Sequence, residues 1–126
     1  MIALVKEPID PNLWLAKLNM EGAGSVVTHL GVVKPDPDGR KSRGITFTAA
    51  SGLEAELGEI EGYLRQRLRI IDVVIVRRVG SLGIGDYIFF GAVSASDRAN
   101  AFAACQELVE KIKKLKNIKK QEHYVE

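Results

Sequence analysis

Two segments of the chain carry apolar residues at the spacing of an amphipathic helix. In residues 51–69, leucine and isoleucine recur every three or four positions, which predicts a helix with one buried face. Ser51 and Glu54 stand three positions apart, so they can form a capping box at its start. Gly58 and Gly62 lie inside this helix, and their small size favours close packing against a sheet.

Residues 96–116 predict the second long helix, which Ser96 or Asp97 can cap. A shorter helix is predicted after Asp10, because Pro11 suits a first helical position, where its missing N–H would be unpaired anyway. The expected apolar face of the second long helix comprises Phe102, Cys105, Leu108, Val109, Ile112 and Leu115.

The remaining apolar segments are rich in β-branched residues and predict strands. They are residues 1–7, 24–34, 45–49, 70–80 and 87–95, with a short strand after the second long helix. This order of strands and helices predicts an α+β fold in one domain, residues 1–126. The loop at residues 35–44 is rich in proline, aspartate and glycine, so we expect it to be mobile and to join its flanking strands as a long hairpin.

The glycine-rich sequence GSLGIGD, at residues 80–86, could be taken for a nucleotide-binding loop. Such a loop follows a strand and opens a helix, so that the phosphate meets the helix N-terminus. Here a predicted strand follows instead, which favours a hairpin turn.

Charge is distributed unevenly, although the net charge is only +2. Residues 111–126 hold six lysines and two glutamates, so positive charge is concentrated near the C-terminal end. This concentration attracts anions locally, but it lacks the broad basic face of a duplex-binding protein.

Cysteine and histidine are scarce. A single cysteine, Cys105, excludes an internal disulfide, fits a reducing compartment and is expected in the core. With His29 and His123 it has no metal-ligand spacing, so we expect no metal and no cofactor, and we expect His29 to be structural. No signal peptide or membrane-spanning segment is expected, which indicates a cytoplasmic protein without a membrane partner.

The stretch KIKKLKNIKKQE, residues 111–122, has two interpretations. Lysines at the C-terminus of a helix are favoured by its dipole and aid solubility. Alternatively, the chain folds back after residue 116 and brings Lys113 and Lys120 to one pocket. Paired amines suit a phosphate, and an amine in a dry site can act as a nucleophile or base.

Three arginines are also candidates for an anion site. Arg77 and Arg78 are neighbours at the end of a predicted strand, so they must point to opposite faces and one of them can face a pocket. Arg98 stands in the first turn of a predicted helix, where anions are favoured, although a lone arginine there is more often a surface residue.

Three segments together resemble the large, catalytic subunit of molybdopterin synthase, the MoaE family. GAGSVVTHLGVVK is similar to the family's early strand, VVIVRRVGSLGIGDYIFFGAVSASDRANAFAAC to its central block, and KIKKLKNIKKQE to its end block. The match covers about residues 10–122. It implies the α/β-hammerhead fold of that subunit.

The resemblance also implies an enzyme, a sulfurtransferase of molybdenum cofactor biosynthesis. A small ubiquitin-like carrier subunit would bring a C-terminal Gly-Gly thiocarboxylate to the large subunit, a homodimer within a heterotetramer. Two sulfurs would pass to cyclic pyranopterin monophosphate and form the dithiolene of molybdopterin.

Residue roles follow from the same resemblance. Lys113 and Lys120 match the family's two active-site lysines and are the expected catalytic residues. Asp97 stands where the family has the histidine of a His-Arg pair. The expected substrate-binding residues are Arg98, Lys34, Arg78 and Lys119.

Two other functions stay open at this point. The chain can be a catalytically lapsed paralogue that serves as a binding or scaffold module for the carrier or for an anionic ligand. It can also bind nucleic acid through its lysines, but only Tyr124 lies near them for base stacking, so we expect no nucleic-acid partner.

Overall fold

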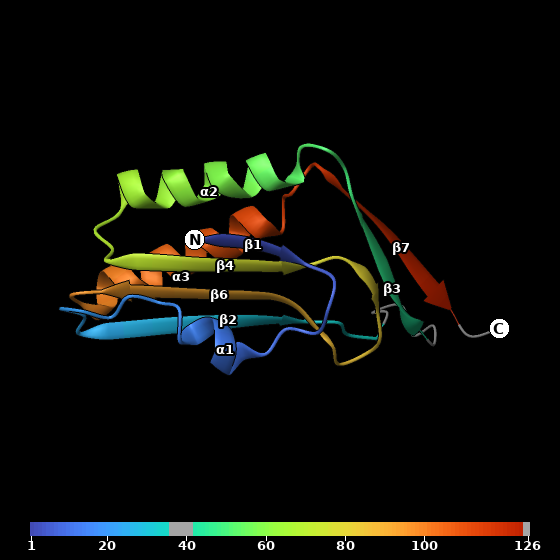
Figure 1. Cartoon of the computed structure of the whole chain (residues 1–126), viewed down its shortest axis with the longest axis horizontal. Helices are drawn as coiled ribbons and strands as arrows, with labels where there is room; N and C mark the ends of the chain where they lie inside the picture. Colours follow the sequence, from blue (N-terminus) through green and yellow to red (C-terminus); the bar gives the residue numbers. More distant parts are fainter. Residues whose placement is uncertain (36–41, 125–126) are drawn as a thin grey trace.

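The computed structural model describes residues 1–35 and 42–124, and its larger sheet has four strands in the order β1-β4-β6-β2 (Figure 1). These are β1 (Ile2–Val5), β4 (Asp72–Arg78), β6 (Tyr87–Ala95) and β2 (Ser25–Val32). β1 runs parallel to β4, whereas β6 is antiparallel to both β4 and β2. The two central strands, β4 and β6, carry the most strongly apolar sequences and are almost wholly buried.

The smaller sheet consists of β5 (Gly80–Leu82), β3 (Ser42–Ala49) and β7 (Ile118–Tyr124), all antiparallel. Figure 1 shows β3 and β7 side by side at one end of the larger sheet. The expected hairpin between β2 and β3 is wrong, because β2 pairs with β6 while β3 pairs with β5 and β7. The loop that joins β2 to β3 lies largely outside the described residues, so its mobility stays a prediction.

Helices cover both faces of the larger sheet. α2 (Leu53–Arg67) and α3 (Arg98–Ile112) pack on one face, and the short α1 (Pro11–Leu15) packs on the other. Side chains of β4 alternate between these faces: Val73 and Ile75 join the core under α2 and α3, whereas Val74 and Val76 join the core under α1. None of the described helices has the length and apolarity required to cross a bilayer.

The start of α2 differs from the expected capping box. The N-cap is Gly52, which has no side chain with which to cap the helix. A Cβ atom on Gly52 would lie 2.9 Å from the Asn117 side-chain oxygen. Asn117, which directly precedes β7, therefore occupies the space beside the start of α2. The close packing expected at Gly58 and Gly62 is also wrong, because among the described residues no atom beyond the adjoining helix backbone lies within 4 Å of a Cβ atom built at either position.

α3 begins as expected, with Asp97 as its cap: the Asp97 carboxylate accepts a hydrogen bond of 2.8 Å from the Asn100 amide. Its buried face differs at one position. Phe102 is 61 % exposed, because the helix packs through Ala101, Ala104, Cys105 and Leu108. Cys105 lies in the core, as predicted, and burial raises the pKa of its thiol.

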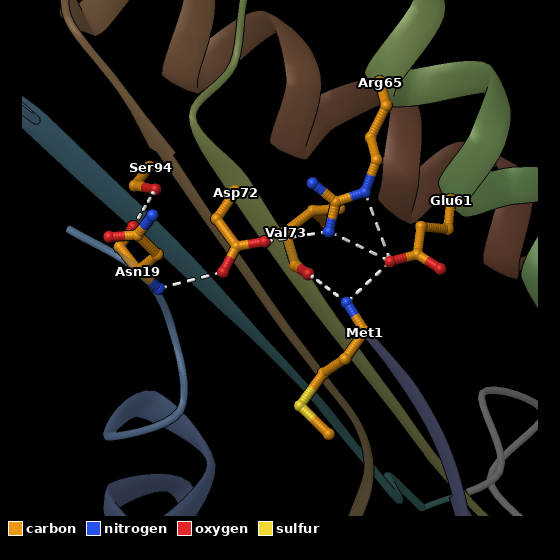
Figure 2. Close-up of polar contacts among 7 residues, drawn as sticks. All are labelled: Met1, Asn19, Glu61, Arg65, Asp72, Val73 and Ser94. Carbon is orange, nitrogen blue, oxygen red and sulfur yellow. Dashed lines mark hydrogen bonds and ion pairs between the residues drawn. The ribbon is translucent and has the colours of Figure 1, made fainter. Parts of the chain in front are cut away.

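An ion-pair cluster joins the edge strand β1 to α2 and β4 (Figure 2). The Met1 amino group lies 2.6 Å from Glu61 Oε2 and donates to the Val73 carbonyl at 2.7 Å. Arg65 bridges Glu61 at 3.0 Å and Asp72 at 2.8 Å. The cluster therefore fixes α2 over this corner of the sheet, at the end remote from the smaller sheet (Figures 1 and 2).

Candidate functional site

A pocket of about 730 Å³ lies where the two sheets meet. Its walls come from β2, β4 and β6 of the larger sheet, from β3 and β7 of the smaller sheet, and from the C-terminal end of α3. Much of the lining is apolar. The charged lining residues are Lys34, Arg77, Lys113, Lys120 and Glu122.

The chain folds back after α3 and brings the two predicted lysines to this pocket. Lys113 is the C-cap of α3, and Lys120 lies in β7, the short strand expected there. Both line the pocket, and so does Lys34, which follows β2. Both Lys113 and Lys120 are exposed, so the dry surroundings expected for a reactive amine are absent from the single chain.

The turn between the two lysines is held by Glu56, from the first turn of α2. Its carboxylate accepts hydrogen bonds from the Lys116 amide at 2.9 Å, the Asn117 amide at 3.0 Å and the Asn117 side chain at 3.1 Å. Burial alone would raise the pKa of Glu56, but these hydrogen bonds outweigh it and lower that pKa. Asn117 is bound on its other side too, since its carbonyl accepts from the Ala50 amide at 2.9 Å.

The arginine in the pocket is Arg77, not the expected Arg78. Val73, Ile75 and Arg77 occupy alternate positions of β4, so their side chains share one face. This is the face covered by α2 and α3. Arg78 points to the opposite face, where its Nε donates to the Lys6 carbonyl at 3.2 Å. Alternation along the strand predicted that the two arginines diverge, and the family resemblance pointed to Arg78, whereas Arg77 is the one that lines the pocket.

Lys119 and Arg98 are not among the residues that line the pocket. Lys119 alternates with Lys120 along β7, so the two side chains point to opposite faces. Arg98 begins α3 and Lys113 ends it; a 15-residue helix is about 22 Å long, which separates them within one chain.

Comparison with known proteins settles the family. The model of the MoaE protein family matches residues 4–115. The chain belongs to the MoaE family. It is 32% identical over 116 residues to the molybdopterin synthase catalytic subunit of Pyrococcus abyssi, covering 90% of this chain and 78% of that one. The corresponding protein of Caulobacter vibrioides is 29% identical over 126 residues, covering 98% and 83%.

Solved structures agree with the family assignment. The crystal structure of molybdopterin synthase from Staphylococcus aureus matches with a TM-score of 0.90 at 28% identity, covering 98% of this chain and 90% of that one. A chain from the complex of subunits 1 and 2 of the Helicobacter pylori molybdopterin-converting factor matches with a TM-score of 0.76 at 15% identity, covering 99% and 90%, and shows the shared fold alone. The α+β fold expected for a MoaE large subunit is therefore confirmed.

Asp97, which replaces the histidine expected from the family resemblance, is engaged in capping α3. Oδ1 accepts from the Asn100 amide, and Oδ2 accepts from the Asn100 side chain at 2.8 Å. The hydrogen bonds to Asn100 lower the pKa of Asp97. Its negative charge and both of its acceptor oxygens are thus committed to the start of α3, at the opposite end of the helix from Lys113.

His29, which the apolar residues around it predict to be structural, is one of the residues that line the pocket. Its ring lies 5.9 Å from that of Phe89, and it lines both the main pocket and a shallower groove of about 440 Å³ between β2 and α3. The groove also includes Lys113. The one signal in the sequence was a titratable ring in an otherwise apolar strand. Within residues 1–35 and 42–124, no cluster of histidine, cysteine and carboxylate residues could hold a metal ion.

Proposed function

We propose that this MoaE-family chain is the large, catalytic subunit of a molybdopterin synthase, an enzyme of molybdenum cofactor biosynthesis. It would transfer sulfur from a thiocarboxylated carrier protein to cyclic pyranopterin monophosphate and form the molybdopterin dithiolene. The observation that carries the proposal is the convergence of Lys113 and Lys120 on one pocket. Its relatives in Pyrococcus abyssi and Caulobacter vibrioides are named molybdopterin synthase catalytic subunits, which supports the same activity and does not favour a lapsed scaffold protein.

The pocket suits an anionic pterin. Its volume of about 730 Å³ falls in the range of small-molecule sites, and its apolar walls can accept a ring system. Lys34, Lys113 and Lys120 place cationic charge around it, which would bind and orient a phosphate. We assign catalysis to Lys113 and Lys120 and substrate binding to Lys34.

The exposure of the two lysines fits a carrier protein as co-substrate. A narrow C-terminal tail that enters the pocket would exclude water from the amines, which the single chain leaves open. Each transfer would form a carbon–sulfur bond on the substrate and break the one in the carrier, with an oxygen from the substrate or from water completing the carrier's carboxylate. Two carriers would therefore be used for each dithiolene. General acid–base assistance by an amine would move the protons as sulfur adds.

The cellular compartment and the oligomeric state belong to the same proposal. The chain would act as one domain, in the cytoplasm, as a homodimer within a heterotetramer. Arg98 could assist substrate binding only from a second copy, because Lys113 lies at the other end of the same helix. That requirement ties any catalytic role of Arg98 to the homodimer.

The test is a reconstitution. Purified protein, thiocarboxylated carrier and cyclic pyranopterin monophosphate would be mixed, and molybdopterin would be measured. We expect product from the wild type, none from Lys120→Ala, and near wild-type yield from Lys119→Ala, which removes the same charge from the other face of β7. Loss of activity in both variants, or in neither, would contradict the role assigned to Lys120.

A further inference from the structure

We propose that Arg77 binds an oxyanion at the buried end of the pocket, through its Nε and Nη2 groups. The oxyanion would be the phosphate of the small-molecule substrate or the terminal carboxylate of the carrier, two groups that a guanidinium recognises in the same way. This inference deepens the proposed function and rests on it, because it identifies which residue receives the anionic end of a reactant.

Arg77 is buried but incompletely partnered. Its side chain belongs to a residue only 5% exposed, and Nη1 donates to the carbonyls of Arg78 and Ile88. Among residues 1–35 and 42–124, nothing accepts a hydrogen bond from Nε or Nη2, and no carboxylate forms an ion pair with Arg77. Neither Nε nor Nη2 is one of the buried polar atoms without a partner, so both atoms reach the water of the pocket, and an oxyanion can replace that water.

The Arg77 guanidinium is oriented so that the edge formed by Nε and Nη2 has no hydrogen-bond partner among the described residues. The group lies over the Phe47 ring, 4.3 Å from the ring centroid, and the two carbonyl contacts hold Nη1. The edge formed by Nε and Nη2 is the one that binds a carboxylate or phosphate through two parallel hydrogen bonds. The contact with the Phe47 ring and the hydrogen bonds to the two carbonyls therefore fix the plane of the guanidinium before a ligand binds. This lowers the entropic cost of binding.

The neighbouring Arg78, which does not line the pocket, shows how this fold pairs a buried arginine on the other face of β4. Arg78 is also buried, but it is 3.4 Å from the Asp86 carboxylate and donates to a backbone carbonyl. Within the described part of the chain no carboxylate forms an ion pair with Arg77, which faces a pocket whose other charged residues are three lysines and Glu122. Burial lowers the pKa of Arg77 to about 10, so the group keeps its charge at neutral pH while it lacks a counterion.

The experiment is isothermal titration of the full chain with two probes, inorganic phosphate and a peptide that ends in Gly-Gly with a free carboxylate. Arg77→Met removes the fork and the charge, Arg77→Lys keeps the charge alone, and Arg78→Met is the matched control on the opposite face. We expect Arg77→Met to lower the affinity for at least one probe about 10- to 100-fold, which corresponds to the loss of one or two hydrogen bonds to a charged group. Arg77→Lys should recover only part of this loss, and Arg78→Met should change neither affinity by more than about twofold.

The two probes separate the sources of the oxyanion. Dependence of phosphate binding on Arg77 assigns the subsite to the small-molecule substrate, and dependence of peptide binding assigns it to the carrier. If neither affinity changes in Arg77→Met, or if Arg78→Met weakens binding as much, the inference is wrong. These are binding measurements, so they can fail while reconstitution still yields molybdopterin, and they can succeed when it does not.

Thermal denaturation without ligand gives a second, independent readout. If Arg77 serves an absent ligand, Arg77→Met should melt at the same or a higher temperature than the wild type, because it removes an unpaired buried charge. If Arg77 is only structural, the substitution should lower the melting temperature, as Arg78→Met is expected to do. A clear drop for Arg77→Met with unchanged affinities would overturn the proposal. Should Arg78→Met fail to fold, Arg67→Met on the exposed side of α2 controls for the change in charge.

Discussion

Removal of Glu56 tests whether the turn between α3 and β7 positions the two pocket lysines. In Glu56→Ala, three donors lose their carboxylate: the amides of Lys116 and Asn117 and the Asn117 side chain. A hydrogen bond to a charged group contributes about 1.5–3 kcal/mol when it is well buried. Because Glu56 is only partly buried, water can replace some of the lost hydrogen bonds. We therefore expect the free energy of unfolding to fall by about 1–2 kcal/mol in total.

The effect on activity should exceed the effect on stability. Lys113 and Lys120 keep their charge in Glu56→Ala but lose the anchor between them, so substrate binding should change less than the chemical step. We expect kcat for molybdopterin formation to fall about 10- to 100-fold, the usual cost of a small misplacement of catalytic groups, with KM changed by less than about threefold. Chemical denaturation and the reconstituted assay measure the two quantities. Glu59→Ala, an exposed glutamate on the same helix, is the matched control.

The pH dependence of stability gives a further check on Glu56. Its folded-state pKa lies below the usual 4.5, so between the two values the native state binds fewer protons than the unfolded state. The stabilisation is therefore complete above pH 4.5 and is lost as the pH falls through the lowered pKa. The difference in the free energy of unfolding between wild type and Glu56→Gln should therefore become smaller as the pH is lowered below 4.5. Equal stability and equal kcat of wild type and Glu56→Ala at neutral pH would refute the positioning role.

Two further predictions concern α2 and its ion-pair cluster. Gly58→Ala and Gly62→Ala should each raise the free energy of unfolding by about 0.5–1 kcal/mol, because both positions are helical and have open space for a methyl group; no rise in melting temperature would contradict this. For Glu61, burial raises the pKa, but hydrogen bonds from the Met1 amino group and Arg65 outweigh it, so the pKa lies below 4.5. Glu61→Gln should therefore cost about 0.5–1 kcal/mol above pH 4.5 and progressively less as the pH falls below it, as measured by urea unfolding at a series of pH values.

Local patterns predicted the elements well, because their causes are local. The strand at residues 87–95 was predicted with the bounds that β6 has, since its apolar composition and flanking turn define both ends. Asp97 was one of the two predicted caps of α3, with Ser96 the other, because a cap depends on residues only three positions apart. The fold-back that joins Lys113 and Lys120 was one of two open interpretations, and the structure supports it.

Features that depend on distant contacts were mispredicted. Alternation shows that Arg77 and Arg78 diverge, but only the packing of α2 and α3 decides which face holds the pocket. The division of β2 and β3 between two sheets depends on pairing with strands far along the chain. The displaced start of α2 likewise depends on Asn117, more than sixty residues away, whose side chain lies against Gly52.

The pocket is shared between two sheets that the hydrogen-bond ladders do not connect, and this has a mechanical consequence. Lys113 is carried by α3, which packs on the larger sheet, whereas Lys120 is carried by the smaller sheet. The separation of the two amines thus depends on how the two sheets pack, and Glu56 and Asn117 link the elements that carry them. A ligand that touches both amines would bridge the two sheets, and slower amide hydrogen exchange along β3 and β7 on binding would record that added constraint.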